Sequence, residues 1–293
     1  MKQIFNISFM TRGKVICPLL LIIFVSVAQS QNLNGRDFAI DSEKAFEVLV
    51  DSAEYYSSIK NWKDAERTTI SALRLKPANK SNWLLWANLA EIRQNLDDPE
   101  GALEAYNIGL SLQPNSINML SGRAALLISE KKMDDALTDL DLLLKNDSTL
   151  EWPRMIRGMV LMELKNTTEA EKDFEYLKRN YPENTQGYNG LASIAIQNGE
   201  IDKAITLYSE SLKIMPDETI YFYKVTLLAD NGRLPEASET LREAMKAFPR
   251  NGNLYLLRAY LHRLNYQNEE AEIALKLAKE YGADQTLIDR LKL

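Results

Sequence analysis

Apolar residues recur along this chain at helical spacing, and the pattern repeats about every 34 residues. In each repeat an alanine is followed four residues later by a larger residue and, three residues beyond that, by a small or apolar one. These positions share one face of a helix, because a helical turn takes about 3.6 residues. The alanines that open the seven runs are Ala65, Ala102, Ala136, Ala170, Ala204, Ala237 and Ala271.

The helix that begins near each alanine is predicted to be the second of a pair. Small residues at its first and third apolar positions let a neighbouring helix approach closely, and the larger residue between them fills the gap. A proline follows in most repeats, and proline cannot continue a helix. These prolines are Pro77, Pro114, Pro182, Pro216 and Pro249. The pattern therefore predicts second helices that end just before a proline.

A second signature lies fifteen or sixteen residues upstream of the alanine and predicts the first helix of the pair. It reads Trp86-x-x-Leu89-Ala90, Arg154-x-x-Arg157-Gly158, Tyr188-x-x-Leu191-Ala192, Phe222-x-x-Val225-Thr226 and Tyr255-x-x-Arg258-Ala259. Gly199 and Gly232 mark turns between the two helices. Pro99 and Pro235 fall at the start of second helices, where a missing N–H costs nothing. Each repeat is thus expected to be a helix–turn–helix unit.

A fixed period of this length indicates stacked helical units. The pattern resembles the tetratricopeptide repeat (TPR) family over nearly the whole chain beyond residue 45. The resemblance implies an all-α fold, a right-handed superhelical solenoid of about seven units with a C-terminal capping helix at 285–293. The array spans 46–284, and its units are 46–79, 83–116, 117–150, 151–184, 185–218, 219–251 and 252–284.

Residues 1–30 differ from the rest of the chain, because three cations precede an apolar run over 15–28. Small residues after this run suit a cleavage site, so the segment is predicted to be a secretory signal peptide removed after Ser30. An uncleaved anchor is the alternative, but roughly 14 apolar residues are fewer than the ~20 that a spanning helix needs. We therefore expect an exported protein, periplasmic in a bacterium and otherwise secreted.

Residues 31–45 are predicted to form a polar leader and the start of the first helix, with Asp41 or Ser42 as its N-cap. Cys17 is the only cysteine and stands at the beginning of the apolar run, whereas a lipoprotein cysteine would follow that run. Cleavage after Ser30 would therefore leave a mature chain without thiol or disulfide chemistry.

The chain has 35 lysines and arginines against 41 aspartates and glutamates, which gives a net charge of −6 at pH 7. Cleavage after Ser30 would remove three positive and no negative charges, so the mature chain would carry −9. Nucleic acid is not an expected partner, because phosphate binding needs a basic surface.

The chain offers few groups for catalysis. His262 is the only histidine, and the repeat register places it on the inward side of a first helix, so a structural role is favoured over a catalytic one. No phosphate loop or dinucleotide fingerprint occurs. Acidic pairs fall at turns or early in second helices, where negative charge complements the helix dipole. We expect no enzyme activity, no cofactor and no metal.

The resemblance implies a concave groove lined by the first helices, and the repeat register maps residues onto it. The expected groove residues are Trp152, Met155, Met159, Met162, Gln186, Asn189, Ser193, Ile196, Tyr223, Leu227 and Tyr260, with Ile220 and Leu256 beside them. Thioether and aromatic side chains adapt to varied apolar partners and concentrate binding energy. The alternative is that this stripe is core, because some of these positions also pack against a neighbouring repeat.

The first two repeats differ, because they present Glu47, Glu54, Glu91 and Gln94 at the corresponding positions. A groove with an acidic end and an apolar end would orient an extended peptide or helix. Some TPR proteins hold a terminal carboxylate with a lysine and an asparagine on one first helix. The second repeat has Ala87 and Glu91 at those positions, so this carboxylate clamp is not expected.

These observations favour a non-enzymatic scaffold that holds a partner protein or peptide segment in its groove, in cell-envelope assembly or secretion. The alternative is a structural subunit of a larger envelope complex, attached through convex faces or chain ends. A third class, an enzyme or carbohydrate-binding protein that uses groove carboxylates, is disfavoured by the same inventory of groups.

Overall fold

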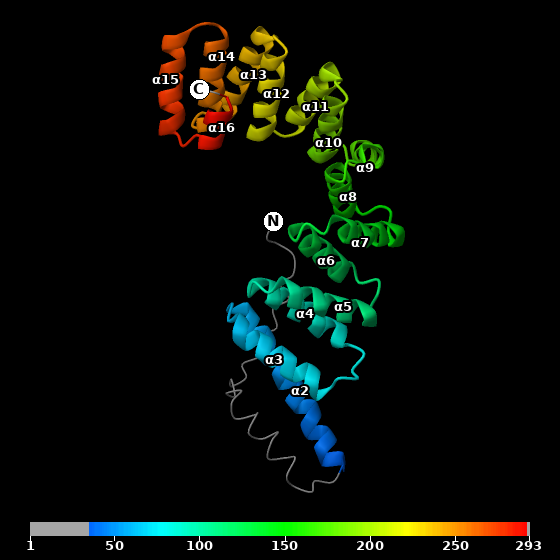
Figure 1. Cartoon of the computed structure of the whole chain (residues 1–293). Helices are drawn as coiled ribbons and strands as arrows, with labels where there is room; N and C mark the ends of the chain where they lie inside the picture. The colour runs from blue at the N-terminus through cyan, green and yellow to red at the C-terminus, as the bar shows by residue number, and fades with distance from the viewer. Residues whose placement is uncertain (1–34, 292–293) are drawn as a thin grey trace. The chain divides into compact units, whose positions relative to one another are not determined.

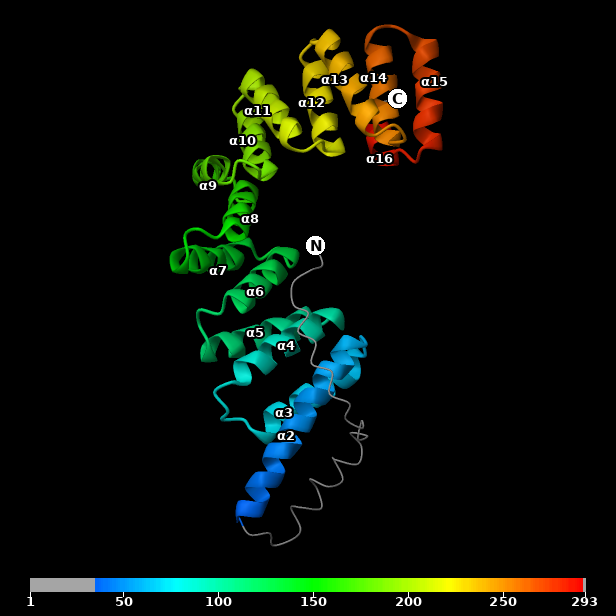
Figure 2. The same ribbon diagram turned by 180° about the vertical axis from the view of Figure 1, so that it is seen from behind.

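The computed structural model describes residues 35–291 as a succession of helix pairs joined by short turns (Figures 1 and 2). This part of the chain contains no strand. The helices are α2 (Gly35–Ser58), α3 (Trp62–Leu75), α4 (Asn82–Asn95), α5 (Pro99–Leu112), α6 (Ile117–Ser129), α7 (Met133–Asn146), α8 (Glu151–Glu163), α9 (Thr167–Asn180), α10 (Thr185–Gln197), α11 (Ile201–Ile214), α12 (Glu218–Asp230), α13 (Leu234–Ala247), α14 (Gly252–Leu264), α15 (Asn268–Glu280) and α16 (Gln285–Arg290). The predicted all-α fold, a solenoid of helical repeats, is confirmed.

The predictions for the N-terminal segment divide into those that lie outside the described residues and one that the structure contradicts. The proposed signal peptide, its cleavage after Ser30 and Cys17 lie outside the described residues. The prediction that Asp41 or Ser42 caps the first helix is wrong, because α2 already begins at Gly35. Residues 36–40 contain neither proline nor glycine, so the helix can continue back to Gly35 without a break.

The chain separates into two compact units, with the boundary after Leu126 inside α6. The first unit holds α2 to α5 and most of α6. The second unit begins with the end of α6 and contains α7 to α16. All the residues expected in the apolar groove belong to the second unit.

The repeat register seen in the sequence is confirmed by burial. Every alanine that opens a second helix has at most 1% of its surface exposed: Ala65, Ala102, Ala136, Ala170, Ala204, Ala237 and Ala271. Proline also acts as predicted, since α9 ends at Asn180, two residues before Pro182. The helices α3, α5, α11 and α13 end at the same distance from their prolines.

The turn between the two helices of each repeat has one residue in the left-handed conformation. These residues are Lys60, Asp97, Lys131, Lys165, Gly199, Gly232 and Tyr266. Gly199 and Gly232 are the two that the sequence marked, since glycine adopts positive φ without steric cost. The other five turns take the same conformation with a side chain present, so the repeat geometry and not glycine alone sets the turn.

Close approach between helices explains the small residues of the fourth and fifth repeats. Phe174 of α9 is buried between Gly158 of α8 and Gly190 of α10. A Cβ atom on Gly190 would lie 2.5 Å from the Phe174 ring, and one on Gly158 would lie 2.9 Å from it. Any larger residue at these positions would overpack the contact.

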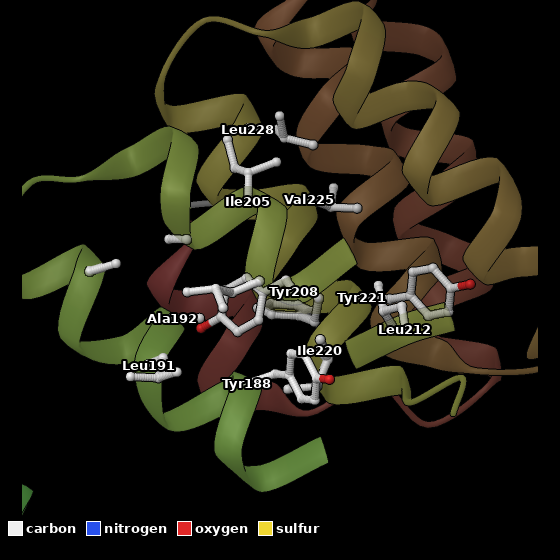
Figure 3. Close-up of a cluster of buried hydrophobic side chains, with 14 of the residues drawn as sticks. Tyr188, Leu191, Ala192, Ile205, Tyr208, Leu212, Ile220, Tyr221, Val225 and Leu228 are labelled. Atoms are coloured by element: carbon white, nitrogen blue, oxygen red, sulfur yellow. The ribbon is translucent and has the colours of Figure 1, made fainter. Parts of the chain in front are cut away.

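The core of the second unit is a continuous apolar cluster that runs through α8 to α14. Figure 3 shows part of it, where Tyr188 of α10 and Tyr208 of α11 lie beside Ile220 of α12. At the end of the array, Ile288 of α16 is buried with Leu256 of α14. The short C-terminal helix therefore covers apolar surface that the last helix pair would leave exposed.

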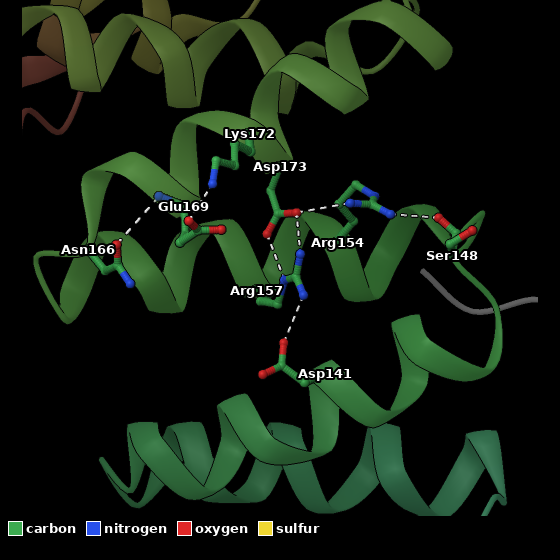
Figure 4. A network of polar contacts seen from close by, with 8 residues as sticks. All are labelled: Asp141, Ser148, Arg154, Arg157, Asn166, Glu169, Lys172 and Asp173. Atoms are coloured by element: carbon green, nitrogen blue, oxygen red, sulfur yellow. Dashed lines mark hydrogen bonds and ion pairs between the residues drawn. The ribbon is translucent and has the colours of Figure 1, made fainter.

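In the fourth repeat, ion pairs join helices α8 and α9 (Figure 4). The Asp173 carboxylate of α9 is 1% exposed and accepts two hydrogen bonds from Arg157 of α8, at 2.7 and 2.8 Å. Arg154 donates to the same carboxylate at 3.0 Å and to the carbonyl oxygen of Ser148 at 2.7 Å. Arg157 also reaches Asp141 of α7 at 2.8 Å.

This network was not predicted, although the sequence carries a signal for it. Arg154 stands where the other quoted signatures have an aromatic residue, and Arg157 stands where three of them have Leu or Val and one has Arg258. An arginine at an inward position requires a buried acceptor, because an unpaired charge is costly inside a protein. Asp173 is that acceptor, and its hydrogen bonds to Arg157 raise the pKa of the guanidinium.

Candidate protein-binding face

The eleven expected groove residues come from four first helices, α8, α10, α12 and α14. We call them together the first-helix face. Its exposed members are Trp152, Met159, Gln186, Ile196 and Tyr223, and its half-buried members are Met155, Met162, Asn189, Ser193, Leu227 and Tyr260. None of the eleven is fully buried, so the stripe lies at the surface of the second unit. That a partner binds to it remains a prediction.

Helix α8 contributes the most apolar part of the first-helix face. Trp152 and Met159 are seven residues apart, which places them on one side of the helix. They are 38% and 52% exposed. Met155 and Met162 lie half-buried against the core cluster, while Val160 and Leu161 face the interior. Core packing therefore fixes the helix, and two large side chains are left in solvent.

Helices α10 and α12 are linked through a tyrosine of the intervening helix α11. Tyr208 is hydrogen-bonded to Ser193 of α10 and stacks on Tyr223 of α12, with ring centroids 6.4 Å apart. Burial raises the pKa of Tyr208, and the Ser193 hydrogen bond offsets part of that rise. Tyr223 keeps 47% of its surface exposed, so the stack holds one face of its ring in place and leaves the rest accessible.

Tyr260 of α14 is fixed by a polar contact. Its hydroxyl donates to the Asp230 carboxylate of α12 at 2.7 Å. Burial, and then this carboxylate, raise the pKa of Tyr260 to about 12. The ring also packs against the core cluster, as does Leu227. Tyr260 is therefore partly structural, whereas Met159 and Tyr223 leave 52% and 47% of their surface exposed to a partner.

Two residues expected beside the groove belong to the core instead. Leu256 is 0% exposed and Ile220 is 7% exposed. Leu256 shares a cluster with Ile288 of α16, so the capping helix covers this part of α14. Ile220 is packed in the main cluster of the second unit. The expectation that these two residues line the groove is wrong, because a neighbouring helix occupies the space that a partner would need.

The residues expected at the acidic end of the groove, in the first two repeats, are also at the surface. Glu47, Glu54, Glu91 and Gln94 are exposed. Glu54 and Glu91 line an open pocket of about 430 Å³ in the first unit, together with Trp62. The first unit thus presents carboxylates where the second unit presents methionine and aromatic side chains.

His262 is half-buried in α14 and stands at the edge of the core rather than within it. Its Nε2 atom accepts a hydrogen bond from Arg258 Nε at 3.4 Å, and its Nδ1 atom lies 2.8 Å from the Gln267 amide oxygen. Both contacts are satisfied by a neutral ring with its proton on Nδ1. The contacts of this side chain are structural ones.

The described residues contain no group of three or more histidine, cysteine, aspartate or glutamate side chains placed to hold a metal ion. Within residues 35–291, no helix combines the length and the apolar character needed to span a membrane.

Comparison with known proteins agrees with the repeat geometry. A family model of the tetratricopeptide repeat matches residues 157–219 and 224–285, both in the second unit. No curated protein matches the sequence.

Solved structures extend the likeness to the rest of the chain. A tetratricopeptide repeat protein from Parabacteroides merdae is 25% identical, with a TM-score of 0.64 over 84% of this chain and 96% of that one. Yeast Tom70 is 18% identical, with a TM-score of 0.55 over 94% of this chain and 56% of that one. MamA from Desulfovibrio magneticus is 17% identical, with a TM-score of 0.52 over 57% of this chain and 94% of that one. The last two show the fold alone.

Proposed function

Because the chain is a tetratricopeptide repeat protein, we propose that it is a non-enzymatic scaffold that holds a partner protein or peptide segment on its first-helix face. Stacked helical repeats build extended surfaces that suit this task. The fold hosts many functions, so the proposal rests on the face itself. We propose further that the protein is exported and acts in cell-envelope assembly or secretion.

The observation that carries the proposal is the exposure of Trp152, Met159 and Tyr223 on helices whose opposite sides are core. The exposed part of each side chain contributes little to folding, and a partner that covers it gains its burial. Aromatic anchors dominate binding energies in protein interfaces, and methionine adapts to irregular partners. The Tyr223 ring is also restrained, since it is stacked on Tyr208. This restraint lowers the entropic cost of binding.

The chemistry of the first-helix face indicates the kind of segment it holds. None of its eleven residues is an aspartate or a glutamate, although the chain has a net charge of −6. Asp230, a carboxylate beside this face, already accepts the Tyr260 hydrogen bond. An apolar segment, either extended or helical, is therefore the proposed occupant.

The triple variant Trp152→Ala, Met159→Ala and Tyr223→Ala tests the face. If each anchor contributes about 1–2 kcal/mol, partner affinity falls by roughly a hundredfold or more. The melting temperature changes little, since truncation of exposed side chains opens no cavity. Partners cross-linked in the native host and identified by mass spectrometry supply the binding assay, and circular dichroism follows the fold.

A matched control truncates the same number of exposed apolar side chains on second helices. Leu112, Ile214 and Ile273 are exposed and lie on α5, α11 and α15, so their alanine variant keeps the first-helix face intact. We expect this control to bind as the parent does. Full partner capture by the face variant, with loss in the control, would instead support the alternative of a structural subunit attached through its other faces.

Export has its own test. We expect the mature protein to begin at Gln31 and to be recovered outside the cytoplasm, free of the membrane fraction. The measurement is N-terminal sequencing of protein purified from each cell fraction. A chain that still carries Met1 in the membrane fraction would support the uncleaved anchor and remove the export proposal.

A further inference from the structure

A second surface of the second unit has a composition that the first-helix face lacks. A pocket of about 490 Å³ lies between α13 and α14 and reaches the turn after α14. Leu241, Met245 and Leu261 give it an apolar floor, and Arg242, Lys246 and Arg258 bring positive charge. Its other lining residues are Ser238, His262, Asn265 and Gln267. No carboxylate lines it.

The charges of this pocket are compensated only in part, by a carboxylate outside its lining. Arg242 is ion-paired with Glu239 one turn earlier on α13. Among the described residues, none forms an ion pair with Lys246 or Arg258. The only side-chain partner of Arg258 is the neutral ring of His262, which leaves its remaining N–H groups available. Lys246 and Arg258 thus have no ion pair of their own, although Lys246, after Arg242, helps to lower the pKa of Glu239. Two such cations beside an apolar floor favour an anionic ligand.

Tyr266, at the turn beside the pocket, provides an independent observation. It lies between Asn265 and Gln267, which both line the pocket. Its φ of 61° is left-handed, a conformation in which a bulky side chain is disfavoured. The ring is also 92% exposed, the most of any large hydrophobic residue described. Because Lys60, Asp97, Lys131 and Lys165 have the same left-handed conformation, the repeat geometry accounts for the backbone, and the exposure of the Tyr266 ring is the feature that folding does not require.

We propose that the α13–α14 pocket and Tyr266 together bind an acidic protein segment with an apolar residue at its centre. The carboxylates of the segment pair with Lys246 and Arg258, its apolar residue rests on the floor formed by Leu241 and Leu261, and Tyr266 covers it from the turn. This surface is distinct from the first-helix face and does not depend on it.

The first test separates binding from folding at Tyr266. The probe is a fluorescein-labelled synthetic peptide with central leucines flanked by glutamates, titrated into the purified protein and followed by fluorescence anisotropy. Tyr266→Gly relieves the left-handed strain, so its melting temperature stays at or above that of the parent. Peptide affinity falls by about tenfold, the share expected of one aromatic anchor. Unchanged affinity in Tyr266→Gly overturns the role of the turn.

The second test addresses the charges. Lys246→Glu with Arg258→Glu abolishes peptide binding, while Lys213→Glu with Lys276→Glu, which changes the net charge equally at exposed positions of α11 and α15, leaves at least half of it. Added salt weakens binding to the parent, because exposed charges are screened. Equal losses in the two charge variants would mean that net charge alone attracts the peptide, and the proposal would fail.

Three controls identify what is bound and where. A peptide with lysines in place of the glutamates does not bind, and inorganic phosphate at millimolar concentration does not displace the acidic peptide. Complete displacement by phosphate would show a simple anion site and overturn the proposal of a protein segment. The triple variant of the first-helix face binds the acidic peptide as the parent does. A loss there would place the peptide on that face instead.

Discussion

The fourth and fifth repeats have the same architecture and opposite chemistry. Each pairs a first helix of 13 residues with a second helix of 14. In the fourth repeat, α8 and α9 meet through Arg154, Arg157 and Asp173 (Figure 4). In the fifth repeat, the residues 34 positions later are Tyr188, Leu191 and Leu207, all buried in the apolar cluster.

This exchange shows which parts of a repeat specify the fold. All three positions change together, so the contact remains self-consistent as either an ion network or an apolar core. The small residues do not change in character, since Ala170 and Ala204 are both 0% exposed. The fold therefore depends on where helices approach closely, while the residues between those points are free to vary as a set.

The largest effect is expected from a charge placed at the close approach in the fifth repeat. Ala204→Glu inserts a carboxylate and additional volume where the structure provides neither a partner nor space. We expect the free energy of unfolding to fall by about 3–5 kcal/mol. Denaturant titration measures it. A melting temperature equal to that of the parent would mean that the repeat register described here is wrong.

The second effect breaks the network of the fourth repeat. Asp173→Ala leaves the guanidinium groups of Arg154 and Arg157 without their shared acceptor. We expect a loss of about 3 kcal/mol, at the low end of the range for a broken buried pair because both arginines keep some contact with water. Thermal and chemical denaturation measure the loss.

A matched variant tests whether charge is needed at all in that contact. Arg154→Tyr, Arg157→Leu and Asp173→Leu together give the fourth repeat the residues of the fifth. Replacement of a whole buried network by apolar residues is often neutral or stabilising, so we expect a free energy of unfolding within about 1 kcal/mol of the parent or above it. A loss as large as that of Asp173→Ala would show that the two repeats are not interchangeable at these positions.

The same comparison explains what the sequence could predict. The spacing of Ala170 and Ala204 reports a close approach that recurs in every repeat, and the prolines report helix ends in most repeats. Both are local properties. The pairing of Arg157 with Asp173 is not local, because it joins two helices across 16 residues. Its presence could be suspected from the arginines, but the acceptor had to be seen.

The candidate site was predictable to the same degree. Helical register places Met159 and Tyr223 at the surface, where the structure has them. It fails for Leu256, which stands at the same position of its repeat as Tyr223 but lies under α16. A position that is open in the middle of an array can be covered at its end. The α13–α14 pocket was missed for a related reason. Its cations lie on two helices of different repeats, and the repeat pattern compares positions only within equivalent helices.

The smallest effect is expected at the end of α8. Glu163 is exposed, and the residue 34 positions later, Gln197, is exposed as well. Glu163→Gln therefore gives the fourth repeat the uncharged residue that the fifth already carries. We expect the free energy of unfolding to change by no more than about 0.5 kcal/mol, since neither a cavity nor an unpaired buried group results. Because Glu163 adjoins Met162 on the first-helix face, partner capture is measured beside stability. An apolar occupant is expected to bind the variant as it binds the parent, whereas a large change in capture would mean that the occupant carries positive charge at that end.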